Sequence, residues 1–416
     1  MGLVGNLGPS IGNLTRLRTL DLSYNLLYGE IPPAIGRLSH VLYLDLSNNS
    51  LQGEIPPTIG QLQRLSYLDL SNNSLQGEFT DGLRNCSRLV TIKLDLNNLS
   101  GQIPDWIGGL SMLKSMSLGK NNFTGIIPPS LGNLSSLQVV YLNDNHLSGP
   151  IPKDLGRLGN LEVLALHVNH LSGTVPQTVF NLSTLIHISL HKNELEGTLP
   201  SDLGNGLPKI QYLILAVNHF RGHIPASIAN ATTMQSIDLS YNSLTGIVPP
   251  EIGTISLNYL LLNGNQLKAT SNHDWKFITL LTNSTMLRGV ALQNNRFGGV
   301  FPSSIANLSA QLGRLDIRFN ELSGRIPDGI GNLPKLFKLG LAGNQFTGHI
   351  PDSIGRLKML QFLTLENNQL SGTMPSSLGN LTLLQHLSVD NNMLEGPLPP
   401  NLGNLQLTVK VFIFGN

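Results

Sequence analysis

An asparagine returns every 24 residues along most of this chain. It keeps an unbroken period at Asn25, Asn49, Asn73, Asn97, Asn121, Asn145, Asn169 and Asn193. It continues with small changes of spacing at Asn218, Asn242, Asn265, Asn295, Asn320, Asn344, Asn368 and Asn392. A fixed period of this length indicates a stack of short units, each of which buries its apolar side chains only against its neighbours. The sequence therefore predicts about sixteen repeats in one elongated domain, with any function spread over a long surface.

Each asparagine closes the phrase L-x-x-L-x-L-x-x-N-x-L, as in Leu65, Leu68, Leu70, Asn73 and Leu75. This is the leucine-rich-repeat pattern. Its leucines alternate with other residues, which predicts a short parallel strand per repeat with the leucines facing inward. We therefore expect an α/β leucine-rich-repeat solenoid, a curved right-handed coil with a parallel β-sheet on its concave side. The asparagine amide both donates and accepts, so it is expected to bridge successive turns.

A second signature, G-x-I-P, follows many of the asparagines, as at residues 53–56, 149–152 and 324–327. Glycine widens the range of backbone conformations at a turn, and proline removes a hydrogen-bond donor. Such a segment suits a sheet edge, so we expect a second extended ribbon on the convex side, followed by short helical turns. This form resembles the plant-specific leucine-rich repeat of plant receptor kinases, receptor-like proteins and polygalacturonase inhibitors.

One repeat is lengthened, because the spacing between Asn265 and Asn295 is 30 residues and the insertion lies near 266–295. It contains D-W-x-F at 274–277, then L-T-N-x-[ST] at 281–285. These phrases resemble the class of plant receptor kinases that includes the rice bacterial-blight resistance receptor and, more distantly, the flagellin and elongation-factor receptors. The resemblance implies the ectodomain of a receptor-like kinase.

Two features of the lengthened repeat bear on its role. Ser284 stands where that class of receptor kinases has a cysteine. Trp275 and Phe277 offer either an exposed anchor for a partner or a filling for the longer turn, and we expect the filling because large aromatic side chains in longer loops usually serve burial. Cys86 is the only cysteine, so no disulfide within the chain is expected, and a small buried residue is its simplest interpretation.

The ends of the chain depart from the repeat pattern. Residues 1–405 are expected to form the solenoid, and 406–416 an atypical C-terminal tail that drops the leucine pattern. The chain opens inside a repeat, and neither a signal peptide nor an apolar run long enough for a membrane helix is recognisable. We therefore expect a truncated product without direct membrane contact, whose full-length relative lies on the extracellular face of the plasma membrane.

Charge excludes one class of partner. The formal net charge is +1, only 12% of residues are charged, and no Lys or Arg run forms a stripe, so no nucleic-acid partner is expected. Sequons of the N-x-[ST] type recur, and those in the convex N-L-[ST] phrase are the best glycosylation candidates. These candidates are Asn133, Asn181, Asn307 and Asn380.

Exposed positions of the concave sheet are expected six, four, two and one residues before each asparagine. In the middle repeats these positions carry an apolar and aromatic strip, and exposed apolar patches usually mark interfaces. The strip comprises Val139, Tyr141, Val163, Ala165, Val168, Tyr212, Ile214, Val217, Tyr259 and Leu261. We expect it to bind a peptide or protein ligand. The earlier row of Asp21, Asp45 and Asp69 could attract a cation or a basic partner. Because L-D-L-S is the commonest sequence of this strand, we expect the row to be structural.

Polar groups join the same face at two places. His167 and His191 occupy one row on adjacent strands near His187, which offers a metal site, a pH sensor or plain hydrogen bonding, and we expect hydrogen bonding and no metal. Arg314 and Arg318 share a strand and are candidates to clamp a ligand carboxylate, unless Asp316 between them satisfies them internally.

No catalytic residue and no cofactor are expected. Kinase phrases, G-x-S-x-G and H-E-x-x-H are all missing from the sequence, and kinase activity is expected only in a full-length relative. We predict the ligand-recognition ectodomain of an immune-type receptor kinase, which presents its C-terminal repeats to a co-receptor ectodomain. The alternatives are a soluble inhibitor of a secreted cell-wall hydrolase such as polygalacturonase, and a decoy or non-functional truncated receptor.

Overall fold

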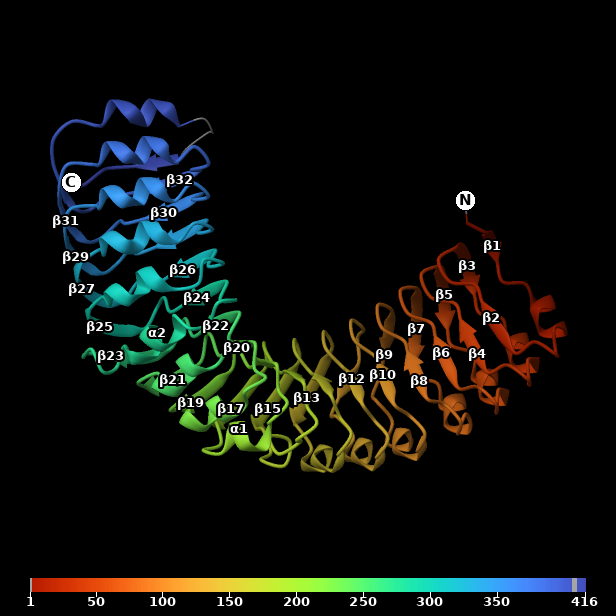
Figure 1. Cartoon of the computed structure of the whole chain (residues 1–416). Coiled ribbons are helices and arrows are strands. Elements are labelled where there is room, and N and C mark those ends of the chain that lie inside the picture. The colour runs from red at the N-terminus through yellow and green to blue at the C-terminus, as the bar shows by residue number, and fades with distance from the viewer. Residues whose placement is uncertain (1, 406–409) are drawn as a thin grey trace. The chain divides into compact units, whose positions relative to one another are not determined.

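The computed structural model describes residues 2–405 and 410–416. The chain divides into two compact units, Met1–Gly197 and Thr198–Asn416. Within each unit a typical repeat contributes one strand to a first sheet, a second strand to a separate ribbon, and one helical turn (Figure 1). The expected leucine-rich-repeat solenoid with a parallel sheet is confirmed.

Strands of the first sheet pair in parallel with the neighbouring repeat, as in the register Tyr43↔Tyr67↔Thr91. In the first unit they are β2 (Thr19–Asp21), β4 (Tyr43–Asp45), β6 (Tyr67–Asp69), β8 (Thr91–Lys93), β10 (Ser115–Ser117), β12 (Val139–Tyr141), β14 (Val163–Ala165) and β16 (His187–Ser189). In the second unit they are β18 (Tyr212–Ile214), β20 (Ser236–Asp238), β22 (Tyr259–Leu261), β24 (Gly289–Ala291), β26 (Arg314–Asp316), β28 (Lys338–Gly340), β30 (Phe362–Thr364), β32 (His386–Ser388) and β34 (Lys410–Phe412).

Most strands of the expected second ribbon begin directly after a periodic asparagine. In the first unit it contains β1 (Val4–Asn6), β3 (Leu26–Glu30), β5 (Ser50–Glu54), β7 (Ser74–Glu78), β9 (Asn98–Ser100), β11 (Thr124–Gly125), β13 (His146–Pro150), β15 (His170–Thr174) and β17 (Glu194–Thr198). In the second unit it contains β19 (His219–Gly222), β21 (Ser243–Gly246), β23 (Gln266–Ala269), β25 (Arg296–Val300), β27 (Glu321–Arg325), β29 (Gln345–Gly348), β31 (Gln369–Gly372) and β33 (Met393–Leu394). Its glycines need the left-handed backbone region, with φ of +76° at Gly53 and +83° at Gly324, which explains the glycine of G-x-I-P.

Helical turns follow the prolines of the same signature, since proline suits the first position of a helix. Those of the first unit are the 3₁₀ turns η1 (Pro9–Asn13), η2 (Pro33–Arg37), η3 (Pro57–Gln61), η4 (Asp81–Asn85), η5 (Asp105–Gly109), η6 (Pro129–Asn133) and η7 (Lys153–Arg157). Those of the second unit are α1 (Leu203–Gly206), η8 (Ala226–Asn230), η9 (Pro250–Thr254), α2 (Lys276–Leu281), η10 (Ser303–Asn307), η11 (Asp328–Asn332), η12 (Asp352–Arg356), η13 (Ser376–Asn380) and η14 (Pro400–Asn404).

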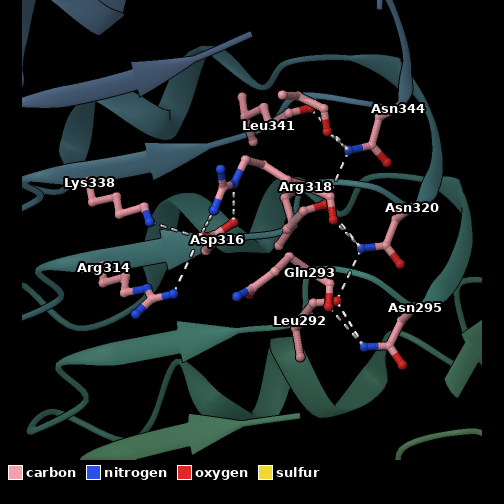
Figure 2. A network of polar contacts seen from close by, with 12 residues as sticks. Leu292, Gln293, Asn295, Arg314, Asp316, Arg318, Asn320, Lys338, Leu341 and Asn344 are labelled. Atoms are coloured by element: carbon pink, nitrogen blue, oxygen red, sulfur yellow. Dashed lines mark hydrogen bonds and ion pairs between the residues drawn. The ribbon is translucent and has the colours of Figure 1, made fainter. Parts of the chain in front are cut away.

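The periodic asparagines, which we call anchor asparagines, bridge the turns as expected. The Nδ2 group of Asn73 donates to Leu46 O of the preceding repeat at 3.0 Å and to Leu70 O of its own repeat at 3.2 Å. Its Oδ1 accepts from the backbone N–H of Leu51 at 2.9 Å. The same arrangement recurs at Asn320 and Asn344, where it can be followed in Figure 2. These amides satisfy backbone groups that the turn would otherwise bury without partners.

The lengthened repeat is packed around its aromatic side chains, as expected. Trp275 is 2% exposed and Phe277 is fully buried, and the Trp275 indole donates to Gly298 O at 3.1 Å. Ser284 donates through Oγ to Ile255 O of the preceding repeat at 2.7 Å. Cys86 is likewise buried and lies 3.5 Å from Ile59 O, so the serine preserves a contact that a cysteine makes elsewhere in the chain.

The C-terminal segment differs from the atypical tail expected over 406–416. Residues 406–409 lie outside the described residues, but β34 pairs in register with β32 and extends the first sheet. Asn416 then takes the place of a further anchor asparagine, because its Nδ2 donates to Val389 O at 3.3 Å. The spacing of 24 residues from Asn392 carried this signal, although Lys, Val and Phe replace the usual leucine spelling.

Candidate recognition surface

The solvent-facing side of the first sheet, here called the open face, carries the positions expected from the sequence. Tyr141 and Tyr259 are 39% and 41% exposed, whereas the adjacent Leu142 and the equivalent Leu215 are fully buried. Neighbouring residues of one strand therefore point to opposite sides, as the alternation predicts. The strand phase assumed for the candidate residues is confirmed.

In the first unit the apolar part of the open face lies on β12 and β14. Val139 pairs with Val163, and both are half-buried. Tyr141 pairs with Ala165, which is only 1% exposed, because its single methyl group does not reach past its neighbours. The expectation that Ala165 is exposed is therefore wrong, and Tyr141 supplies most of the accessible apolar surface there.

The histidines continue this surface and hydrogen-bond within the chain. The rings of His167 and His191 stack with centroids 4.3 Å apart, and Ser189 Oγ lies 3.2 Å from Nδ1 of His167 and 3.0 Å from Nδ1 of His191. Asp144 Oδ2 lies 3.8 Å from His167 Nε2, so a carboxylate that the sequence reading overlooked faces this pair. Among residues 2–405 and 410–416 no group of three or more His, Cys, Asp or Glu side chains is arranged to hold a metal ion.

Burial controls the charge of these histidines. Burial and the neighbouring ring of His191 lower the pKa of His167 to about 4, although Asp144 opposes the shift. Burial and His191 also lower the pKa of His187. Around neutral pH His167 therefore presents a neutral imidazole on the open face.

In the second unit the expected strip is interrupted. Tyr212 and Ile214 on β18 pair with Ser236 and Asp238 on β20, and β20 separates them from Tyr259 and Leu261 on β22. The apolar strip expected across several neighbouring strands is interrupted here, because a polar strand lies between the two apolar ones. The apolar side chains form separate patches, one on β18 and one on β22.

The arginine pair is neutralised in part by its own strand. Asp316 is fully buried and accepts from Arg318 Nε at 2.8 Å and from Arg314 at 3.3 Å, while Lys338 Nζ lies 3.2 Å away (Figure 2). Burial opposes ionisation of Asp316, but the hydrogen bonds and charges of Arg318 and Lys338 outweigh it and lower its pKa. Asp316 therefore pairs with both arginines, which is the alternative that the sequence left open, and three cations share one carboxylate.

A hollow of about 600 Å³ lies beside this cluster, and sequence reasoning did not identify it. Tyr259, Leu261 and Arg314 line it, and all three were among the candidate residues. Its other lining residues are Arg288, Gly289, Gln311, Gly313, Lys335 and Phe337. Most of these lie seven or nine residues before an anchor asparagine, outside the rows that were counted. The sequence signal that could have indicated the hollow is the pair Gly289 and Gly313, which lie where two neighbouring strands begin.

The early acidic row is structural, as expected. Asp45 and Asp69 are 7% and 5% exposed. Asp69 accepts from the Tyr67 hydroxyl at 3.0 Å and from Ser71 N at 3.0 Å, and Lys93 Nζ lies 3.3 Å from it. These carboxylates already have partners within the chain.

The glycosylation candidates lie on the surface away from the open face. The four glycosylation candidates, Asn133, Asn181, Asn307 and Asn380, are all exposed. In the described part of the chain no helix is long and apolar enough to cross a bilayer.

The repeat geometry and the open face define a leucine-rich-repeat binding domain of the plant-specific type. Leucine-rich-repeat family models match residues 15–75 and 87–147, and also 233–255, 311–333, 335–357, 359–381 and 383–405. The ectodomain of the Arabidopsis receptor kinase HAESA, solved with the peptide hormone IDA and the co-receptor SERK1, is 33% identical with a TM-score of 0.87. That match covers 98% of this chain and 71% of the solved one. The chain belongs to the family of plant leucine-rich-repeat receptor-kinase ectodomains.

Two further comparisons place the chain within this family. The Arabidopsis GASSHO1/SCHENGEN3 ectodomain, in complex with CASPARIAN STRIP INTEGRITY FACTOR 2, is 32% identical with a TM-score of 0.85, over 100% of this chain and 52% of that one. The receptor kinase-like protein Xa21 of Oryza sativa subsp. japonica is 41% identical over 78 residues, or 19% of this chain. The matched stretch spans 8% of the length of Xa21.

Proposed function

We propose that this chain is the extracellular ligand-recognition domain of an immune-type plant receptor kinase, and that it binds a peptide or protein on its open face. The observation that carries the proposal is the set of large apolar side chains held out to solvent one residue away from fully buried leucines, such as Tyr141 beside Leu142. Nothing in the packing of the repeat requires an aromatic side chain there, whereas a binding interface does.

The relatives support the class of ligand. HAESA is described in complex with a peptide hormone and a co-receptor, and GASSHO1/SCHENGEN3 in complex with CASPARIAN STRIP INTEGRITY FACTOR 2. By analogy, a peptide ligand would lie along the open face and a co-receptor ectodomain would contact the C-terminal repeats. The D-W-x-F insertion and the likeness to Xa21 favour an immune-type receptor over an inhibitor of a cell-wall hydrolase. In this role the chain binds and does not catalyse, it acts outside the cell, and its exposed sequons carry glycans.

The proposal is tested by selecting binders for the purified chain from a random dodecapeptide library displayed on phage. A selected peptide is then titrated against the wild-type chain and against a variant with Tyr141→Ala, Tyr212→Ala and Tyr259→Ala. We expect the variant to bind about tenfold more weakly or worse, because exposed aromatic side chains dominate such interfaces.

The matched control carries Ile126→Ala, Val300→Ala and Met393→Ala, which remove three exposed apolar side chains away from the open face. It should bind like the wild-type chain. Undiminished binding by the tyrosine variant, with a loss in the control, would contradict the proposal.

A further inference from the structure

We propose that the hollow on the open face of the second unit is a subsite for an acidic side chain of the ligand, with an apolar ligand residue next to it. The inference rests on the proposed function and adds the chemistry of the ligand. It follows from how the hollow is made, from the charges around it, and from its exposed aromatic walls.

Two glycines make the hollow. Gly289 follows Tyr259 in the same row of the sheet, and a Cβ atom at Gly289 would lie 2.9 Å from Cδ1 of the Tyr259 ring. A Cβ atom at Gly313 would lie 2.8 Å from Cε1 of Phe337. Neither glycine has a positive φ, so the backbone does not require glycine at either place. The two rings occupy space that side chains would otherwise take, and the surface between the rings is left open.

Positive charge exceeds negative charge around the hollow. Arg288 and Lys335 are exposed, and in the described part of the chain neither forms an ion pair. Lys335 Nζ is held toward the hollow by a hydrogen bond to Gln311 Oε1 of 2.6 Å. Arg314 also lines the hollow, and the carboxylate that pairs with it, Asp316, is shared with two further cations.

The state of Arg314 gives a second indication. Its Nε atom is buried and has no hydrogen-bond partner among the described residues, so one donor of the guanidinium group remains unsatisfied. A buried donor without an acceptor costs free energy. A carboxylate that enters the hollow supplies hydrogen-bond acceptors to these cations, whose donors outnumber the acceptors that the protein provides.

The apolar side chains that line the hollow indicate which ligand residue lies next to the acidic one. Tyr259 and Phe337 are 41% and 42% exposed, and half-buried Leu261 lies on β22, the strand that also carries Tyr259. A ligand with charge alone would leave these rings in water. A carboxylate beside an apolar side chain matches both the cations and the rings, whereas a neutral peptide leaves Arg288 and Lys335 without a negative partner.

The test uses a synthetic peptide, Gly-Phe-Glu-Glu-Leu-Gly-amide, labelled on its N-terminal amine with tetramethylrhodamine and titrated against the whole chain by fluorescence anisotropy. A twin peptide has Gln in place of both Glu residues. A third peptide is the Gln twin with a free C-terminal carboxylate. The Glu peptide should bind the wild-type chain about tenfold more tightly than the Gln twin, because charge-assisted hydrogen bonds to the cations are the stronger ones.

Exposed residues supply the variants, so the fold is expected to survive and is checked by circular dichroism. Arg288→Gln with Lys335→Gln should abolish the preference for the Glu peptide. The control Arg221→Gln with Arg325→Gln removes the same charge from the ribbon and should retain the preference. Phe337→Ala should weaken the Glu peptide and the Gln twin alike and keep their ratio.

Several results would overturn the subsite. They are equal binding of the Glu and Gln peptides to the wild-type chain, a preference that survives Arg288→Gln with Lys335→Gln, and tight binding only of the peptide with the free carboxylate. If selected peptides bind the open face without any preference for acid, the subsite is wrong and the proposed function stands. If the tyrosine variant binds selected peptides undiminished, the proposed function is wrong.

Discussion

Each anchor asparagine joins one turn to the next through a single side chain. Asn169 is 7% exposed, donates to Leu142 O at 3.0 Å and accepts from Leu147 N at 3.0 Å. Leu147 is fully buried, so its N–H has no access to water once the amide is removed. Asn169→Ala should therefore lower the free energy of unfolding by about 2–4 kcal/mol, measured by urea denaturation.

Asn169→Asp provides the comparison for that variant, because aspartate keeps an acceptor for Leu147 N but turns a carboxylate oxygen toward Leu142 O and Leu166 O. At about pH 4, where a protonated carboxyl group can still donate to these carbonyls, its urea midpoint should lie between those of wild type and Asn169→Ala. An unchanged midpoint in Asn169→Ala would show that the asparagine is not needed to hold the turns together.

The residue before each anchor asparagine adopts a left-handed backbone. Val217 has φ of +55° there, a conformation that strains a β-branched side chain, whereas other repeats place asparagine at this position, as at Asn294. Val217→Asn should raise the free energy of unfolding by about 1 kcal/mol, because asparagine tolerates this region better. The control Val300→Asn changes an exposed valine outside this region and should show no gain. A lower melting temperature for Val217→Asn would contradict the strain.

The sign of the His167 pKa shift predicts a pH dependence. Its pKa is about 4 in the folded chain and has an ordinary value of 6.5, so below pH 6.5 the unfolded chain binds more protons than the folded one. His167 therefore has no effect on the free energy of unfolding above pH 6.5, and it lowers that free energy as the pH drops from 6.5 to 4. His167→Gln should flatten the fall in melting temperature over that window, whereas exposed His273→Gln should not.

The roles of single residues were predictable where the period fixed them. The anchor asparagines, the buried leucines and the satisfied Asp69 follow from their place in the repeat. The pairing of Asp144 with His167 and the lining of the hollow by Arg288 were not predictable, because they depend on where long side chains turn after leaving the strand. Positions seven and nine residues before an anchor asparagine reach the open face from the loop that enters each strand.

At the level of elements, the lengthened repeat is held by an aromatic cluster. The Trp275 ring lies with its centroid 5.4 Å from that of Phe297 and 5.8 Å from that of Phe277. Trp275→Ala should cost about 3–5 kcal/mol through the cavity it leaves. Trp275→Phe keeps a ring and loses the hydrogen bond to Gly298 O, so it should cost less.

Amide hydrogen exchange would show which elements lose stability in Trp275→Ala. Because each repeat contacts only its neighbours, faster exchange in Trp275→Ala should be confined to α2 and the adjoining strands β23 and β25. Uniformly faster exchange throughout the second unit would contradict this account of the element.

Sequence predicted the elements well wherever leucine and glycine marked them. Both the first sheet and the ribbon appear where the two signatures placed them, since each signature fixes a backbone requirement. β34 was not predicted, because Lys410, Val411 and Phe412 replace the usual leucines. The repeat is recognised from the backbone pairing of β34 with β32 and from the hydrogen bond that Asn416 donates.

At the scale of the whole molecule, recognition is divided among several patches. The first unit offers Tyr141 beside a stacked histidine pair, and the second offers Tyr259 beside a cationic hollow. The apolar residues of the expected strip do not all lie on adjacent strands, because the polar strand β20 separates β18 from β22. The patch in the first unit presents the neutral imidazole of His167 around pH 7, whereas the patch in the second presents an excess of positive charge.

The most direct test of recognition on the open face is photo-crosslinking of a selected peptide that carries a diazirine-labelled leucine, followed by mass spectrometry of the cross-linked chain. Recognition as proposed predicts cross-links to open-face residues such as Tyr141, Tyr212 and Tyr259. Cross-links confined to the helical turns and the second ribbon, with the open face unlabelled, would contradict it.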